Sequence, residues 1–299
     1  MAETWAIETA GLRKSYDGVE ALRGLDLQVP PGSICGFLGR NGAGKTTTMK
    51  ILLGMAHPSG GSARVLGLPA ESPRDSVEIR RRAAFVGEEK DLYGSMTVDE
   101  MVRFTAAFFP RWRGDLQQRY LRQFELPPHR KVKALSRGMR TKLSLLLALC
   151  RGAELLLLDE PTSGLDPAMA EEVLQALVGQ VADEAVTVFF SSHQIAEVEQ
   201  IADRVAIIDR GRAVVAGELD ELRERFCRVR LVFDGDAPRT AFRAPGVERV
   251  DRNGRVLTIL SSRGSEPLVE EASALRPLSI DVDRVTLKEI FLESAAAEE

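Results

Sequence analysis

The sequence predicts an α/β protein in which helices cover both faces of a mainly parallel sheet, with a small α+β appendage at the C-terminal end. Three observations carry this prediction. Apolar runs typical of buried strands alternate with helix-like segments as far as about residue 224, which favours parallel strands joined by helices. Beyond that residue the order of strands and helices changes. The length of 299 residues, 44% of them hydrophobic, is sufficient for a sizeable core.

The first elements surround a glycine-rich loop. Residues 1–32 alternate short apolar runs with turns at Tyr16-Asp17-Gly18 and Pro30-Pro31-Gly32, which predicts strands in a hairpin-like arrangement. The run 34–38 is typical of a buried strand, and 45–53 has the apolar spacing of a helix. A strand, a loop and a helix therefore follow one another.

The middle of the chain predicts two helices and three further strands. Thr97 and Glu100 have the spacing of a capping box, which predicts a helix over about 98–109. Pro127-Pro128 breaks the chain, and a strongly apolar helix is expected over 136–150. Buried strands are expected at 155–158, 186–190 and 205–208.

The appendage begins after residue 224. Strands are expected there at 228–233, 256–260 and 278–282, with helices near 266–275 and 286–294. We therefore expect two domains, residues 1–224 and residues 225–299.

Composition and charge exclude several classes of function. The formal charge of -4 argues against nucleic acid as the main partner, because phosphate binding needs a net basic face. Three widely spaced cysteines make a disulfide or zinc framework improbable. Residues 1–10 have no signal-peptide pattern, so the chain is expected in the cytosol. The longest apolar stretches, such as 143–150, are too short to span a bilayer.

A phosphate-binding loop is the most specific motif. Residues 39–46 fit the pattern G-x-x-x-x-G-K-[ST] between a strand and a helix. Glycines allow successive backbone amides to turn inward, and the helix N-terminus adds partial positive charge. The expected phosphate-binding residues are Gly39, Arg40, Asn41, Gly42, Ala43, Gly44, Lys45 and Thr46. Lys45 would bind the β and γ phosphates, and the Thr46 hydroxyl would bind Mg²⁺.

Two carboxylates follow the apolar strand at 155–158. Asp159 suits the shell of Mg²⁺, and Glu160 is placed to orient a water for attack on the γ-phosphate. Open α/β sheets bind ligands at this end of their strands. Taken alone, the segment is equally consistent with a strand end capped by solvated acids.

Three more segments complete a recognisable series. They are Leu135-Ser136-Arg137-Gly138-Met139, Ser163-Gly164-Leu165-Asp166, and His193 after the strand at 186–190. With the loop and the acidic strand end, they resemble the nucleotide-binding subunits of ATP-binding cassette (ABC) proteins, in family order from about Thr4 to Glu218. The resemblance implies a P-loop NTPase cassette with an antiparallel β subdomain and a helical subdomain at about 92–150. A lone histidine at such a position is usually structural, but this order favours a functional one.

The resemblance also implies roles for individual residues. Ser136 and Gly138 match the family signature, commonly Leu-Ser-Gly-Gly-Gln, while Arg137 and Met139 depart from it as in exporter-type members. Ser136, Gly138 and Asp166 would contact nucleotide across a dimer, His193 would contact the γ-phosphate, and Thr47 would complete the loop. Tyr16 would stack on adenine, although a tyrosine in such a turn is ordinarily just a turn residue. Glu88 stands where most members have a glutamine that contacts Mg²⁺ and the attacking water.

Two clusters have two interpretations each. The aromatic residues Tyr93, Phe104, Phe108, Phe109 and Trp112 are expected to be the core of a helical subdomain, and the resemblance places there a groove for a membrane partner's helix. For the basic cluster 130–142 the two interpretations are a surface that faces nucleotide across the dimer and a solvated face, and a solvated face is expected for all of it except Arg137. His57 and His129 are expected at the surface.

The function implied is the ATP-hydrolysing subunit of an ABC exporter. It would use ATP and Mg²⁺, close as a homodimer or as a heterodimer with a related subunit, and act on separate membrane-spanning permease subunits at the cytoplasmic face of the membrane. The alternative is a soluble ABC ATPase that remodels ribosomes or DNA. Such proteins usually carry two cassettes or a long coiled coil, whereas only 114 positions separate Lys45 from Asp159 and no sustained heptads lie between them. A simple P-loop kinase would leave residues 135–139 and 163–166 unexplained. The transported solute is not encoded in any of these motifs.

Overall fold

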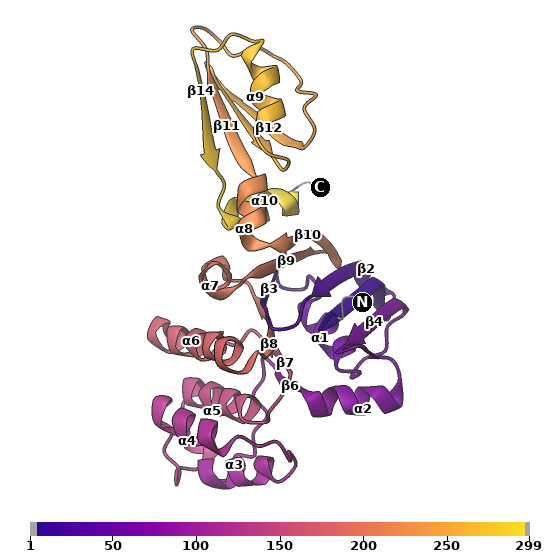
Figure 1. Cartoon of the computed structure of the whole chain (residues 1–299), viewed down its shortest axis with the longest axis vertical. Coiled ribbons are helices and arrows are strands. Elements are labelled where there is room, and N and C mark those ends of the chain that lie inside the picture. Colours follow the sequence, from indigo (N-terminus) through magenta and orange to yellow (C-terminus); the bar gives the residue numbers. More distant parts are fainter. Residues whose placement is uncertain (1–4, 297–299) are drawn as a thin grey trace. The chain divides into compact units, whose positions relative to one another are not determined.

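The chain consists of two compact units, and each is described by itself. The computed structural model describes residues 5–296, so the expected start of the family resemblance at Thr4 lies outside the described residues. The first unit ends at Ala216 and the second begins at Gly217. Figure 1 shows the elements of both.

A six-stranded sheet forms the centre of the first unit. Its strand order is β10-β9-β3-β8-β7-β6, and the four pairs from β9 to β6 are parallel. The three strands β3, β7 and β8 are buried along their whole length, as expected for a sheet covered on both faces. The strands are β3 (Ile34–Gly39), β6 (Ala83–Val86), β7 (Leu155–Asp159), β8 (Thr187–Ser192), β9 (Arg204–Asp209) and β10 (Arg212–Glu218).

A four-stranded antiparallel sheet lies beside it in the order β2-β1-β4-β5. Its strands are β1 (Ile7–Tyr16), β2 (Val19–Val29), β4 (Gly60–Val65) and β5 (Leu68–Pro69). Met49 and Ile51 of helix α1 (Lys45–Leu52) share one buried cluster with Leu25 of β2 and Phe37 of β3. Helix α1 therefore packs against both sheets, and the hairpin expected within residues 1–32 is present.

Helices α6 (Pro167–Glu184) and α7 (Ile195–Ile201) cover the central sheet through contacts with β8 and β3. The approach of α7 is close, because a Cβ added to Gly36 of β3 would lie 2.5 Å from Cγ1 of Val198. With α1 on one face and these helices on the other, the predicted mainly parallel α/β sheet is confirmed.

The remaining helices of the first unit form a largely helical region between β6 and β7 in the sequence (Figure 1). They are α3 (Val98–Ala106), α4 (Gly114–Gln123), a short 3₁₀ turn η1 (Val132–Ala134) and α5 (Arg137–Leu149), while α2 (Pro73–Arg82) precedes β6. The predicted capping box begins α3, since Thr97 Oγ1 accepts from the Glu100 amide and Glu100 Oε2 accepts from the Thr97 amide. The helix expected to reach residue 109 ends at Ala106 and continues as a turn through residue 108, and Pro110 disfavours helical backbone at residue 109.

The expectation that the aromatic residues of this region form its core is wrong for three of them. Tyr93, Phe104 and Phe108 are 58%, 39% and 64% exposed, so they are not core residues. Tyr120 and Phe124 of the α4 segment are the buried aromatics instead, stacked on each other.

In the basic cluster, the side chain of Lys142 is buried rather than solvated. Its ammonium group lies 2.5 Å from Oε2 of Glu172, which joins α5 to α6. The cluster is therefore not uniformly a solvated face, because the tertiary fold brings this acidic partner from a distant part of the sequence.

The second unit contains an antiparallel sheet in the order β12-β13-β11-β14. Its core includes Val229 and Ile259 from the sheet and Leu268 and Ala272 from α9, which therefore covers one face. The elements are α8 (Leu219–Arg225), β11 (Cys227–Val232), β12 (Val247–Asn253), β13 (Val256–Ser261), α9 (Glu266–Ser273), β14 (Ser279–Arg284) and α10 (Leu287–Ala296).

Candidate nucleotide-binding site

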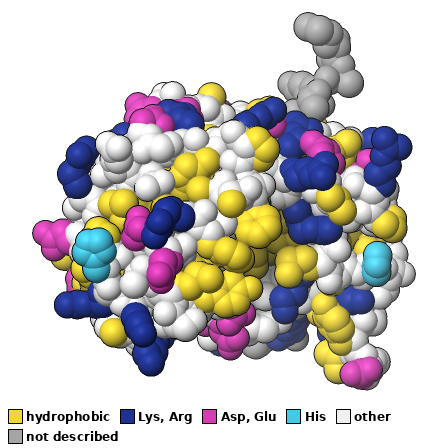
Figure 2. All heavy atoms as spheres, turned by 90° about the horizontal axis from the view of Figure 1, so that it is seen from below, with side chains coloured by type: hydrophobic (Ala, Val, Ile, Leu, Met, Phe, Trp, Pro, Cys, Tyr) yellow, Lys and Arg dark blue, Asp and Glu magenta, His cyan; other side chains and the backbone are white. Residues whose placement is uncertain are grey.

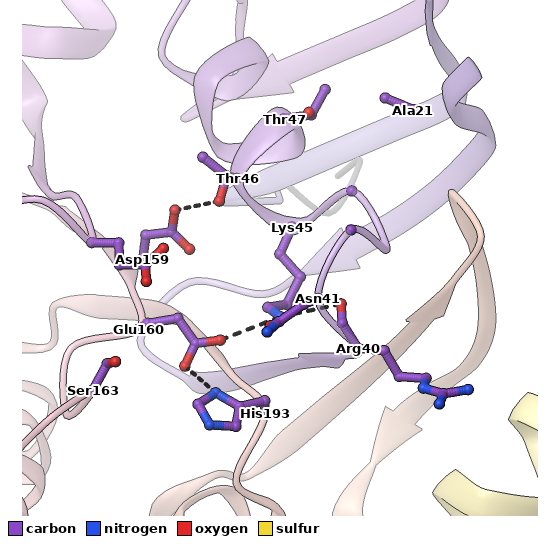
Figure 3. A pocket seen from close by; sticks show the side chains of 13 residues that line it. Ala21, Arg40, Asn41, Lys45, Thr46, Thr47, Asp159, Glu160, Ser163 and His193 are labelled. Atoms are coloured by element: carbon purple, nitrogen blue, oxygen red, sulfur yellow. Dashed lines mark hydrogen bonds and ion pairs between the residues drawn. The ribbon is translucent and has the colours of Figure 1, made fainter. Parts of the chain in front are cut away.

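A cavity of about 370 Å³ opens where β3 and β7 end (Figure 3). It gathers residues from segments far apart in the chain, most of them predicted from the sequence. The lining residues are Ala21, Arg40, Asn41, Gly42, Gly44, Lys45, Thr46, Thr47, Glu88, Asp159, Glu160, Ser163 and His193.

The glycine-rich loop owes its shape to glycines at which a side chain would be strained or would clash with its neighbours. Gly42 and Gly44 have φ of 81° and 111°, and a Cβ on Gly44 would lie 2.7 Å from Leu22 Cδ2. A Cβ on Gly39 would likewise lie 2.7 Å from Ile208. The loop therefore turns tightly into α1, whose N-terminus is directed toward the cavity. Gly39 and Ala43 belong to the loop but do not line the cavity.

Lys45 is the buried cation of the site. Its ammonium group donates to the carbonyl oxygen of Gly39 at 2.8 Å and lies 3.2 Å from Oε1 of Glu160. The side chain is only 7% exposed, so its charge is compensated within the site and is held at the centre of the loop.

Thr46 and Asp159 supply oxygen atoms at one side of the cavity. The Thr46 hydroxyl donates to Oδ2 of Asp159 at 2.6 Å, and Glu88 lines the same cavity. A hydroxyl and two carboxylates fit Mg²⁺, which prefers oxygen ligands and usually keeps several waters.

Glu160 and His193 form a pair at the other side. Oε2 of Glu160 lies 2.7 Å from Nδ1 of His193, and the Glu160 side chain is 9% exposed whereas that of His193 is half exposed. Glu160 has φ of 49°, a left-handed conformation that is unusual for a residue other than glycine. Figure 3 shows its carboxylate between Lys45 and His193.

Sequence reasoning missed two polar residues near this cavity. Burial lowers the pKa of Lys90 to about 8, against the opposing charges of Asp159 and Glu88, so this lysine contributes to the local field. Ser191, in β8, makes hydrogen bonds to both Asp159 and Glu160. The signal for Ser191 was a polar residue that directly follows the apolar run 188–190 of β8, two positions before His193.

The signature residues lie outside the cavity. Ser136 is exposed and caps α5 by accepting from the amide of Met139 at 3.1 Å. Asp166 is also exposed and caps α6 by accepting from the amide of Met169 at 3.0 Å. A Cβ on Gly138 would lie 2.7 Å from Sδ of Met169, so these two helix starts pack together.

Tyr16 does not line the cavity either. It ends β1, is 43% exposed, and has the ammonium group of Lys14 at 4.6 Å from its ring centre. His57 and His129 are exposed, as expected.

Comparisons with known proteins agree with this geometry. The ABC transporter family profile matches residues 22–163. The chain is 38% identical to the daunorubicin/doxorubicin resistance ATP-binding protein DrrA of Streptomyces peucetius over 226 residues, which cover 74% of this chain and 67% of DrrA. It is 32% identical to the daunorubicin resistance ATP-binding protein DrrA3 of Streptomyces coeruleorubidus, over 98% of this chain and 96% of DrrA3.

Solved structures agree at the level of the fold. The structure of an ATP-binding subunit of an ABC transporter superimposes with a TM-score of 0.65 at 29% identity, covering 73% of this chain and 92% of the other. The phosphate loop, the acidic strand end, the signature segment and the relatives matched over most of their length lead to one conclusion: the chain belongs to the ABC transporter family, as an ATP-binding cassette ATPase.

Proposed function

We propose that this chain is the ATP-hydrolysing subunit of an exporter and drives separate membrane-spanning permease subunits. The observation that carries the proposal is the convergence of Lys45, Asp159, Glu160 and His193 on one cavity beside a phosphate-binding loop. Two relatives are named for drug resistance and one for bacitracin transport, which supports an export role.

Each group in the cavity has a chemical task. The loop amides and Lys45 bind the phosphates, and their positive charge is already in place before the reaction. Thr46, Asp159 and Glu88 would hold Mg²⁺, which neutralises phosphate charge when bound. Glu160 orients the attacking water and accepts its proton, while His193 holds the Glu160 carboxylate through Nδ1 and stays accessible to the γ-phosphate.

The signature residues act on nucleotide held by a second subunit. Ser136 is exposed and lies outside the cavity of its own chain, so its hydroxyl and the adjacent helix N-terminus are accessible to nucleotide held by a second chain. Asp166 would lie at the same subunit boundary, and Tyr16 would stack on the adenine ring. ATP then favours the closed dimer, because it contacts both subunits only in that state.

The membrane partner would dock on exposed aromatic side chains of the helical region. The rings of Tyr93, Phe104 and Phe108 form a continuous series with centre distances of 5.5 and 5.2 Å. Figure 2 views the chain from the side of α3 and shows hydrophobic side chains gathered on that face. No helix within residues 5–296 has the length and apolar character to cross a bilayer. The exposed aromatic series supports a location at the cytoplasmic face of the membrane, with the chain bound to a permease.

The test uses Glu160→Gln, which should bind ATP but lose the proton acceptor and so accumulate the closed dimer. Loss of a general base costs roughly 10²- to 10⁴-fold in rate. Tagged Glu160→Gln is purified from detergent-solubilised host membranes with Mg·ATP, and its partners are identified by mass spectrometry. The control is the same variant carrying Lys45→Ala.

A multi-span membrane protein in stoichiometric amount, dependent on ATP and reduced in the control, is the expected result. Ribosomal proteins or DNA-repair factors in its place would overturn the export proposal and support the remodelling alternative. Hydrolysis by Glu160→Gln at the parent rate would overturn the role of Glu160.

A further inference from the structure

We propose that Ser191 is a positioning residue that fixes both acidic residues of the nucleotide site, the side chain of Asp159 and the backbone of Glu160. The inference deepens the proposed function and rests on its assignment of Asp159 to Mg²⁺ and of Glu160 to the attacking water. Ser191 itself does not line the cavity and acts only through these two neighbours.

The contacts of Ser191 use its hydroxyl in both directions. Its Oγ donates to Oδ1 of Asp159 at 2.6 Å and accepts from the amide of Glu160 at 3.0 Å. A hydroxyl can donate one hydrogen bond and accept others through its lone pairs. The Ser191 hydroxyl therefore donates its hydrogen bond to the Asp159 carboxylate and accepts one from the Glu160 amide. Ser191 is 0% exposed and pairs with Asp159 in the parallel register of β7 and β8.

The bond to Glu160 supports a strained turn. The left-handed φ of 49° rotates the Glu160 side chain out of the line of β7, where its carboxylate reaches Lys45 and His193. Such a conformation is strained for a residue other than glycine and persists only where its surroundings hold it. Without the serine hydroxyl, the buried Glu160 amide would lose its only described hydrogen-bond acceptor among residues 5–296.

The two oxygens of the Asp159 carboxylate accept hydrogen bonds from different residues. Ser191 holds Oδ1, and Thr46, the other proposed metal ligand from the loop, holds Oδ2. The orientation of the Asp159 carboxylate is thereby fixed at both oxygens, and Oδ2 is the oxygen bonded to the phosphate loop. Groups that orient a metal ligand in this way typically change metal affinity by 10- to 100-fold when removed.

The next residue provides a matched control. Ser192 is also 0% exposed on β8, and its hydroxyl donates to Oε2 of Glu197 at 2.8 Å and accepts from the amide of Gln194 at 2.9 Å. Each serine hydroxyl therefore donates to one carboxylate and accepts from one amide. The two partners of Ser192 lie at the start of α7. Removing either hydroxyl should destabilise the fold to a similar extent, and only Ser191 touches Asp159 and Glu160.

The experiment compares full-length Ser191→Ala, Ser191→Thr and Ser192→Ala with the parent. Three quantities are measured: ATP affinity in EDTA, the Mg²⁺ concentration that gives half-maximal ATPase activity, and amide hydrogen exchange of residues 159–163 without nucleotide. Ser191→Ala should raise the Mg²⁺ midpoint by roughly tenfold, speed exchange in residues 159–163, and leave ATP affinity in EDTA within about twofold. Ser191→Thr, which keeps the hydroxyl, should restore the Mg²⁺ midpoint.

Ser192→Ala should lower the melting temperature without moving the Mg²⁺ midpoint. The proposal is overturned if Ser191→Ala and Ser192→Ala change all three quantities alike, since both hydroxyls would then be merely structural. The exchange measurement needs no nucleotide, and ATP binding by the parent reports on the site as a whole. Failure of the proposed function and failure of the Ser191 inference are therefore separate results.

Discussion

Glu160 shares its carboxylate between a cation and an imidazole. Oε1 lies 3.2 Å from the Lys45 ammonium and Oε2 lies 2.7 Å from Nδ1 of His193. A phosphate entering the loop would compete with Oε1 for the lysine, because both are anionic acceptors for the same donor. Nucleotide binding would thus free one oxygen of Glu160 to contact water, so the group that binds ATP and the group that hydrolyses it are coupled through one ion pair.

Replacing this lysine tests its role in binding. Lys45→Ala removes a charge-assisted hydrogen bond to phosphate, worth about 1.5–3 kcal/mol, so the Kd for ATP should rise about 10- to 100-fold. The matched control is Lys50→Ala, since Lys50 is an exposed lysine in the last turn of the same helix. Isothermal titration calorimetry measures both. Equal affinities in the two variants would contradict the assignment of Lys45 to the phosphates.

Single residues were predictable where their meaning depends on close neighbours in sequence. The loop from Gly39 to Thr46 and the pair Asp159-Glu160 were found because one continuous segment carries each pattern. The burial of Lys142 was not found, because Glu172 lies 30 positions away on another helix. The role of Ser191 was not found for the same reason, since its two partners come from the adjacent strand.

Elements were predictable to the extent that their own pattern decides them. The helix behind Thr97 begins where its capping box places it, and the apolar strands 155–158 and 186–190 lie within two residues of their expected bounds. Helices α2, α4, α6 and α7 were not predicted separately. Helix α7 has only seven residues, and a helix this short is not stable from its intrinsic propensity alone. Its packing on β3 provides the stabilisation that it needs.

One ion-pair group joins helix α2 to the beginning of β7. Glu154 accepts two hydrogen bonds from Arg82, at 3.0 and 2.6 Å, and lies 3.4 Å from Arg111. The guanidinium of Arg82 holds the pKa of Glu154 below its ordinary value. A lowered pKa contributes stability that is present above the unfolded-state pKa and is lost as the pH falls through the folded-state pKa.

Glu154→Gln should therefore destabilise the chain at pH 7 and matter less in acid. The side chain is 39% exposed, so solvent screening limits the loss to below about 1 kcal/mol. Urea unfolding of the parent and the variant measures the difference at pH 7 and at successively lower pH. The difference should shrink as the pH falls below the ordinary pKa of a glutamate. A constant difference across this range would show that charge is not the cause.

At the scale of the whole molecule, the chain has two units, and each unit has its own hydrophobic core. The motifs of the nucleotide site all lie in the first unit, which has its own buried cluster between two sheets. The second unit has a separate sheet and cluster, including Val229, Ile259 and Leu268. The strands and helices of the second unit were predicted in the correct order, except that β12 and α8 were missed. No motif in this unit indicates a function.

We propose that residues 225–299 form an accessory domain that strengthens the ATP-driven dimer. The second unit exposes apolar side chains at Leu278, Val282 and Leu292, which are 66%, 48% and 54% exposed, and a second subunit that covers them would remove apolar surface from water. Because the nucleotide cavity is formed wholly within the first unit, its affinity for ATP should survive removal of this region.

Deletion of residues 225–299 in the Glu160→Gln background should leave the Kd for ATP within about twofold but weaken dimerisation. We expect half-maximal dimerisation to need roughly tenfold more protein, equivalent to about 1.4 kcal/mol. Analytical ultracentrifugation with Mg·ATP measures the dimer, and Leu278→Asp with Val282→Asp in the full chain tests the exposed surface without removing a core. The accessory role in dimerisation is refuted if the truncated and parent chains dimerise at the same concentration. If the point variants dimerise normally while the truncated chain does not, the contact lies elsewhere on the second unit, because its core is then intact and only this patch has been changed.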